Sequence, residues 1–240
     1  MADWVNKTDR GLQRPRSSPC AEAIHRLPRS QKAVLPAAPN CHNHPNYLCT
    51  ISPMHSMQTL QNHFLLAMPS LTDAYFQRSL VYLCEHSSEG AMGLVVNIPV
   101  DMSLDTMLTK LKLSPPDTAE MKQPVLQGGP VHGDRGFVLH SFRPGFNSTL
   151  QVSDEMMVTT SKDILETLGT DQAPDHWLVA LGYAGWSAGQ LEQELADGAW
   201  LVIPPNPKLV FDTPIHLRWQ QAAASIGVNP LHLSSQVGHS

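Results

Sequence analysis

The stretch His176–Tyr183 constrains the fold of this chain more than any other. Its middle, Trp177 to Leu181, is apolar at every position and does not alternate between apolar and polar residues. A strand of that kind is buried on both faces, so it belongs in the centre of a sheet. The sequence therefore requires strands beside this segment and covering layers above and below it.

Short runs elsewhere supply those neighbours, because they are rich in Val, Leu, Ile and Tyr and end at Gly, Pro or polar turns. We interpret the two runs around residues 79–98 as a hairpin with a long polar turn at His86–Glu89. The further strands that we expect are Phe64–Met68, Ser79–Glu85, Leu94–Ile98, Val125–Gln127 and Gly136–His140. We expect extended chain at Leu150–Val152, Met156–Thr159, Trp200–Ile203 and Leu209–Phe211.

Helical patterns lie between these runs. Leucine and methionine recur at helical spacing over 104–112, behind Ser103 as a candidate N-cap. Capping residues and glycine stops predict three more helices, over 161–168 behind Thr160, 189–196 and 214–226. About eight or nine strands and about four helices that do not alternate favour an α+β class over a doubly wound parallel sheet.

The first 53 residues differ from the rest. They hold seven prolines, seven Lys/Arg and three Asp/Glu, and they show no sustained helical or strand period. We interpret residues 1–53 as a disordered extension or a misassigned start, in front of a domain over 54–240. Cysteine and histidine at 41, 42, 44 and 49 have ligand chemistry, but their spacing fits no standard zinc finger, so we expect no metal site.

Residues 54–240 are acidic, with nine Lys/Arg against eighteen Asp/Glu. Binding to a phosphate backbone depends on Lys and Arg, so we do not expect direct nucleic-acid binding. No window approaches the roughly 18 apolar residues of a membrane helix, and one cysteine in this part indicates a reducing compartment. We expect a cytoplasmic protein without a membrane partner. No dinucleotide fingerprint or P-loop is present, and we expect no cofactor.

Cys84 and His86 are the sharpest chemical pair in the sequence. Residues i and i+2 of a regular strand point to the same face, where a thiol and an imidazole could share a proton. The pair is therefore a candidate catalytic site. The alternative is a buried cysteine that packs as a small apolar residue, beside a histidine at a turn.

A second candidate region is the turn that begins at Gly128 and Gly129. Its backbone N–H groups could form an anion-binding nest, with Arg135 close behind to pair with a carboxylate or phosphate. The alternative is a tight turn that needs glycine for its backbone angles. His140 ends the next strand and could approach His86 if the two strands were neighbours.

The third candidate region is Gly182–Leu195, which we expect to be a glycine-rich loop entering a helix. Tyr183, Trp186 and Gln190 are its candidate ligand-binding residues, near a helix N-terminus that favours anions. The alternative is a packing role for the tryptophan and a hinge role for the glycines. Glu192 and Glu194 are interpreted as a solvated helix face.

Three blocks of the sequence carry a family resemblance: Arg78–Asn97, Gly128–His140 and Leu181–Leu195. Together they closely resemble the YqgE/AlgH family of small bacterial proteins, over about Met57 to Ser240. The resemblance implies a bifurcated, partly barrel-like mixed sheet with helices packed around it, and it includes the string Cys84-Glu85-His86.

The family has no settled activity, and its AlgH branch is labelled a transcriptional regulator of exopolysaccharide (alginate) production. Two functions stay open. The first is a small-ligand-binding or cryptic enzymatic domain with a pocket near Cys84 and His86. The second is an indirect regulator or a non-catalytic interaction protein, because no basic recognition helix is present. The partner is expected to be a small molecule or a protein.

Overall fold

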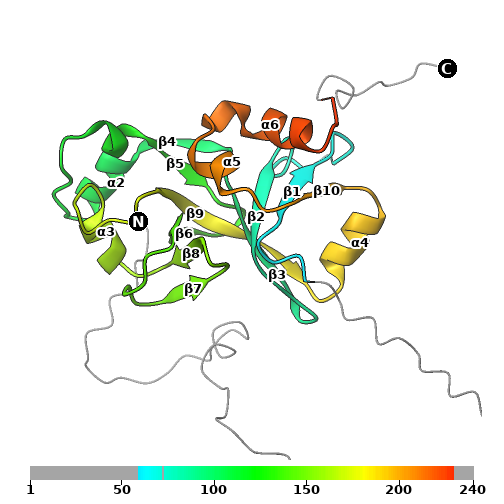
Figure 1. Cartoon of the computed structure of the whole chain (residues 1–240), viewed down its shortest axis with the longest axis horizontal. Coiled ribbons are helices and arrows are strands. Elements are labelled where there is room, and N and C mark those ends of the chain that lie inside the picture. Colours follow the sequence, from blue (N-terminus) through cyan, green and yellow to red (C-terminus); the bar gives the residue numbers. More distant parts are fainter. Residues whose placement is uncertain (1–58, 72, 230–240) are drawn as a thin grey trace, which may run out of the picture. The chain divides into compact units, whose positions relative to one another are not determined.

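The computed structural model describes residues 59–71 and 73–229 (Figure 1). These residues form an α+β fold with one curled, largely antiparallel sheet of ten strands and five short α-helices around it. The expected extension over residues 1–53 lies outside the described part of the chain, as do the cysteine and histidine residues at 41, 42, 44 and 49. No helix within the described ranges is long and apolar enough to cross a membrane.

Strand β9 (Trp177–Ser187) joins the two halves of the sheet, as its apolar sequence predicts. One half runs in the order β10-β1-β2-β3-β9 and the other in the order β9-β6-β8-β7, with β5 beside β9 and β4 beside β5. The remaining strands are β1 (Phe64–Ala67), β2 (Leu80–Ser87), β3 (Gly90–Val95), β4 (Pro99–Ser103), β5 (Pro124–Gln127), β6 (Val131–Ser141), β7 (Thr149–Gln151), β8 (Met156–Thr159) and β10 (Trp200–Ile203).

The sheet forks along one edge of β9. Its other edge pairs with β6 from Trp177 to Leu181 and again at Tyr183, but the forked edge pairs first with β5, at Ala180 and Leu181, and then with β3, from Ala184 to Ser187. The pairing with β5 is parallel and the other two are antiparallel. Gly182 lies between the two partners, so the expected bifurcated, partly barrel-like sheet is confirmed.

Both faces of the β10-β1-β2-β3 half are covered. Alternate residues point in opposite directions, so Leu66 and Tyr82 belong to the core that includes Trp219 and Ala222 of α6 (Arg218–Ser225). Leu65 and Val81 belong to a separate core with Leu191 of α4 (Gln190–Ala196). A third core fills the space beneath α2 (Leu104–Lys110) and α3 (Asp163–Thr167).

Several boundaries differ from the sequence predictions. Residues 209–211 are helical in α5 (Pro207–Phe211), because Pro207 at the first turn fixes a helical φ angle and outweighs the strand preference of Val and Phe. The last helix begins at Arg218, after the 3₁₀ turn η3 (Ile215–Leu217), because Pro214 adopts an extended ψ of 137°. Strand β4 and the 3₁₀ turn η2 (Ala119–Lys122) were not predicted.

Two corrections affect the candidate site. The hairpin of β2 and β3 has a tight turn and not a long one, since Ser87 pairs with Gly90. The region after Gly182 is not a loop, because β9 continues to Ser187 and only two residues separate it from α4. The strand continues there because β3 supplies a hydrogen-bonded neighbour that the sequence does not reveal.

Candidate functional site

Cys84 lies in the core and has no exposed surface. It packs with Phe64, Tyr82 and Leu94 on the α6 side of the sheet, and its Sγ lies 3.6 Å from the carbonyl oxygen of Tyr82. Burial raises the pKa of the Cys84 thiol far above its ordinary value, and the charge of Glu85 raises it further. The thiolate, which is the nucleophilic form, is therefore suppressed.

A β-bulge separates Cys84 from His86. Leu83 pairs with Gly93 and Glu85 pairs with the next residue, Met92, so Cys84 is the extra residue in β2. His86 then pairs with Ala91, which belongs to the α4 core, whereas Cys84 belongs to the α6 core. One extra residue reverses the alternation of faces, so the predicted thiol–imidazole pair is not formed.

Cys84 should consequently be inert to alkylation. At pH 8 we expect iodoacetamide to leave the peptide containing Cys84 unmodified during a time in which free glutathione reacts completely, because the thiol is protonated and inaccessible. Peptide-resolved mass spectrometry measures this, and the same peptide should be labelled in concentrated urea. Native labelling of Cys84 at the rate of glutathione would contradict the buried position.

His86 connects three segments through one side chain that is only 5% exposed. Its Nδ1 accepts a hydrogen bond from the backbone N–H of Leu60 at 3.0 Å, and its Nε2 lies 2.9 Å from Oε1 of Glu192 on α4. Because an N–H group occupies Nδ1, the proton of the neutral ring is on Nε2 and is donated to Glu192. Neither ring nitrogen is left to act as a base.

Glu194 organises the aromatic cluster beside α4. Its Oε2 accepts hydrogen bonds from the indole N–H groups of Trp186 and Trp200, each at 2.8 Å. Its Oε1 accepts from the amide of Gln190 at 3.0 Å, and Gln190 in turn accepts from the backbone N–H of Ser187. The two indoles are buried and lie edge to face at 5.9 Å between ring centroids. Glu192 and Glu194 therefore link α4 to the sheet, and they are not the solvated face that the sequence suggested.

The predicted anion-binding turn lies at the fork of the sheet. The backbone N–H of Gly128 donates to Leu181 at 2.7 Å, and its carbonyl accepts from Val95 at 2.8 Å, so both polar groups are used within the sheet. A Cβ atom on Gly129 would lie 2.2 Å from the carbonyl carbon of Tyr183. These glycines allow β5 and β6 to approach β9, which is a structural role.

Arg135 and Tyr183 lie near this turn but differ in exposure. The residues of β6 between Val131 and Gly136 bulge away from β9, and Arg135 is exposed in that bulge. Tyr183 is half-buried and packs edge to face against Phe137, with ring centroids 5.7 Å apart. The bulge also carries His132, 6.0 Å from the tyrosine ring.

His140 is fully buried and remote from His86, because β3 and β9 separate their strands. Its Nδ1 lies 2.8 Å from the carbonyl oxygen of Ser141, and its Nε2 lies 2.9 Å from the hydroxyl of Thr159. Burial lowers the pKa of His140, although the hydrogen bond to Ser141 acts in the opposite direction. The ring is a neutral core residue, so the expected approach to His86 is wrong.

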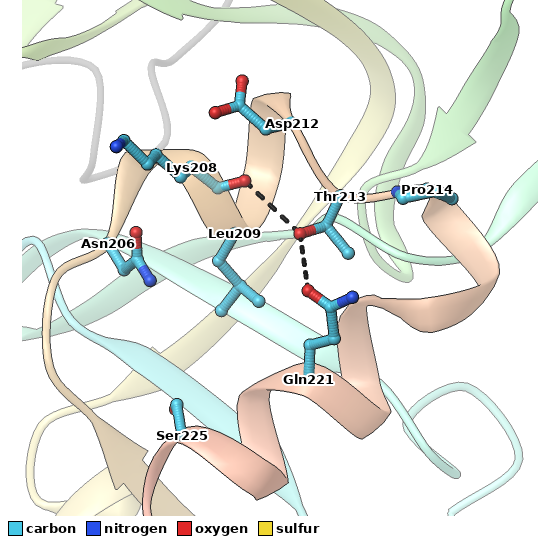
Figure 2. Close-up of a pocket in the computed structure, with 8 residues that line it drawn as sticks. All are labelled: Asn206, Lys208, Leu209, Asp212, Thr213, Pro214, Gln221 and Ser225. Carbon is cyan, nitrogen blue, oxygen red and sulfur yellow. Dashed lines mark hydrogen bonds between the residues drawn. The ribbon is translucent and has the colours of Figure 1, made fainter.

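A surface hollow of about 410 Å³ lies between α5 and α6 (Figure 2). None of the candidate site residues predicted from the sequence lines it. Polar side chains predominate, and Figure 2 shows the amides of Asn206 and Gln221 and the hydroxyl of Thr213 around its centre. The eight residues that line it are Asn206, Lys208, Leu209, Asp212, Thr213, Pro214, Gln221 and Ser225.

Arg218 is buried next to this hollow, with 7% of its surface exposed. Its Nε donates to the carbonyl of Thr213 at 3.0 Å, and its Nη1 donates to the carbonyl of Val96, the residue that follows β3. Burial lowers the pKa of Arg218 to about 10. The side chain remains a cation at neutral pH, and it fixes the start of α6 to the sheet.

Comparison with known proteins places the chain in a family. Residues 64–231 match the AlgH-like family, also designated DUF179. The chain belongs to the AlgH-like family.

Curated relatives of this AlgH-like chain are UPF0301 proteins. One from Aliivibrio fischeri strain MJ11 is 54% identical over 184 residues, which are 75% of this chain and 98% of the relative. Others from Yersinia enterocolitica and Vibrio cholerae are 53% and 50% identical, with the same coverage of both chains. The family resemblance inferred from the three sequence blocks is therefore confirmed.

Two solved structures resemble the fold of this AlgH-like chain. The solution structure of the AlgH protein from Pseudomonas aeruginosa has a TM-score of 0.63 and 44% identity, and covers 77% of this chain and 98% of its own. A crystal structure of a Corynebacterium diphtheriae protein has a TM-score of 0.56 and 20% identity, and covers 72% and 88% respectively. The second likeness shows the fold alone.

Two features of this AlgH-like chain were not predicted from its sequence: the hydrogen bonds that Glu192 and Glu194 accept, and the hollow between α5 and α6. The positions of Glu192 and Glu194 could have indicated their role, since both lie on the short helix that follows Trp186. Nothing in the sequence indicated the hollow, because Asn206 and Gln221 are distant in sequence and only the fold brings them together. Among the described residues, no group of three or more His, Cys, Asp or Glu side chains could hold a metal ion.

Proposed function

We propose that this chain is a non-catalytic protein that binds a small ligand in the hollow between α5 and α6. The observation that carries the proposal is the set of side chains in Figure 2, which come from α5, its flanking residues and α6 and surround an open volume of about 410 Å³. That volume is within the range of small-molecule sites, about 300–1,000 Å³.

The groups that suggested catalysis have structural roles instead. A general base needs a free ring nitrogen, and both nitrogens of His86 and of His140 are hydrogen-bonded within the protein. A nucleophile needs a thiolate and access to substrate, and the Cys84 thiol has neither. These side chains hold β2, α4 and β8 in place, and the polar groups of the hollow are better placed to meet a ligand.

A bulky substitution in the hollow tests the proposal. In wild-type protein, we expect the members of a small-molecule fragment library that bind to shift the ¹H–¹⁵N NMR signals of Gln221 and Ser225. Ser225→Trp should abolish these shifts by filling the hollow, because residue 225 is exposed and lines it. The matched control is Ala224→Trp, at an exposed neighbour outside the lining.

Both variants should keep the wild-type pattern of signals elsewhere in the spectrum. Fragment binding that survives Ser225→Trp, or that is centred on other residues, would contradict the proposal.

The second candidate is a regulator that acts indirectly, through a protein partner. Residues 79–109 and 163–207 contain no Lys or Arg, and the pairing of β3 with β9 brings the two stretches together. Glu85, Glu89 and Asp197 are exposed there, which favours a basic partner surface over nucleic acid. This role does not use the hollow, so Ser225→Trp would leave partner binding intact and separates the two candidates.

A further inference from the structure

The charge of Arg218 has no counter-charge within the described chain. The two hydrogen bonds of its guanidinium go to backbone carbonyls, which satisfy N–H groups but carry no net charge. None of the ion pairs between described residues includes Arg218. A buried cation without an anion is costly, so a site that leaves one unpaired favours the arrival of an anion.

Arg218 adjoins the hollow through two connections. Thr213, whose carbonyl accepts from Arg218, also contributes its side chain to the lining. Gln221 lies one turn further along α6, and it lines the hollow too. The positive charge is therefore one hydrogen bond away from a residue that lines the hollow.

The rim adds one charge of each sign. Lys208 and Asp212 are four residues apart on α5 and its C-cap, yet they form none of the ion pairs between described residues. Lysine preceding the acid is the weaker order for such a helical pair. Figure 2 shows the two side chains extending in different directions. With Arg218, the charges around the hollow sum to one positive charge.

The neutral groups of the hollow mostly offer N–H donors. The Oε1 of Gln221 lies 3.0 Å from the hydroxyl of Thr213 and accepts from it, which leaves the amide NH₂ for a ligand. The side-chain amide of Asn206 does not cap α5 and so remains available. The hydroxyl of Ser225 is already donated to Ala222, at 2.7 Å.

We propose that the ligand of the hollow is a small monocarboxylate, held by Lys208 at the rim, by the amides of Asn206 and Gln221, and by the field of the buried Arg218. This inference rests on the proposed function and names the ligand class for the same site. A single negative charge matches the net charge of the site, whereas Asp212 would repel a doubly charged phosphate. The apolar wall of Leu209 and Pro214 suits a short aliphatic tail.

Isobutyrate and isobutyramide are the probes, because they have the same shape and differ in charge. We expect isobutyrate to shift the side-chain amide signals of Asn206 and Gln221 and the Nε–H signal of Arg218 in a saturable way. Isobutyramide should bind about tenfold more weakly, since hydrogen bonds to a charged group are the stronger ones. Equal binding of the two probes, or no saturable shift with isobutyrate, would overturn the inference.

Three variants locate the charge effects. Lys208→Met should weaken isobutyrate binding about fivefold, and Asp212→Asn should strengthen it about threefold, as expected for exposed charges. Lys112→Met, an exposed lysine after α2, should change nothing. An unchanged affinity in both of the first two variants would overturn the inference, as would tighter binding of inorganic phosphate than of isobutyrate.

The two proposals can fail separately. If neutral fragments bind in the hollow and are lost in Ser225→Trp while isobutyrate does not bind, the carboxylate class is wrong and the ligand site stands. If no fragment binds in the hollow, the proposed function fails as well.

Discussion

Replacing Gly182 with alanine should lower the free energy of unfolding by roughly 3 kcal/mol or more. Gly182 has a φ angle of 73°, in the left-handed region that residues with a Cβ atom avoid. An added Cβ would also lie 2.5 Å from the carbonyl oxygen of Gly129 and 3.0 Å from that of Val131. These atoms belong to the backbone at the fork, so relief requires β6 to move away from β9.

Gly198→Ala is the matched control for this experiment. Gly198 has nearly the same φ angle, 70°, but an added Cβ would meet nothing within 4 Å. Gly198→Ala should lower the free energy of unfolding by only about 1 kcal/mol, which is the cost of the left-handed conformation itself. Urea unfolding of both variants gives the difference that belongs to the fork, and equal losses would show that the strands do not pack closely there.

Removing the carboxylate of Glu194 should have a similarly large effect. Glu194→Ala leaves the indole N–H groups of two buried tryptophans, Trp186 and Trp200, without an acceptor. Each orphaned buried donor costs about 1–3 kcal/mol, so we expect a loss of about 3 kcal/mol in the free energy of unfolding. Chemical denaturation measures it.

Two companion variants separate hydrogen bonding from side-chain size. Glu194→Gln keeps an oxygen acceptor and should lose only about 1 kcal/mol. Gln193→Ala, next to it on α4, removes only an exposed hydrogen bond to Asp197 and should lose less than about 0.5 kcal/mol. If Glu194→Ala is no worse than Gln193→Ala, the carboxylate does not hold the aromatic cluster.

The parts of the fold that depend on local sequence were predictable. The uninterrupted apolar run in β9 indicated a central strand, and leucine and methionine at helical spacing indicated α2, with Ser103 immediately before it. Gly169, Gly198 and Gly227 come after helices and have positive φ angles, as their sequence positions suggested. These features were accessible because each depends on a few adjacent residues.

The candidate site was harder to predict, because its geometry depends on pairing between distant segments. The alternation of faces along a regular strand predicted that Cys84 and His86 share one face. That prediction failed at a β-bulge, where β3 has no residue opposite Cys84. The carboxylate of Glu194 accepts hydrogen bonds from Trp186 in β9 and Trp200 in β10, and the sequence does not show that these two strands bring both indoles to one acceptor. Gly128 and Gly182 suggested turns, but glycine is required there because backbone segments approach closely, and a Cβ on Gly128 would lie 2.2 Å from the carbonyl oxygen of Gly182.

The pairing of β1 with β10 has a consequence for how the protein forms in the cell. Phe64 aligns with Ile203, so the outer edge of β1 stays uncovered until β10 is made, and β10 is synthesised after the other nine strands of the sheet. Until then the apolar residues of β1 and β2 also lack α6, which follows β10 in the sequence. Such long-range closure makes folding slow, and nascent chains that stall before residue 203 should depend most on chaperones.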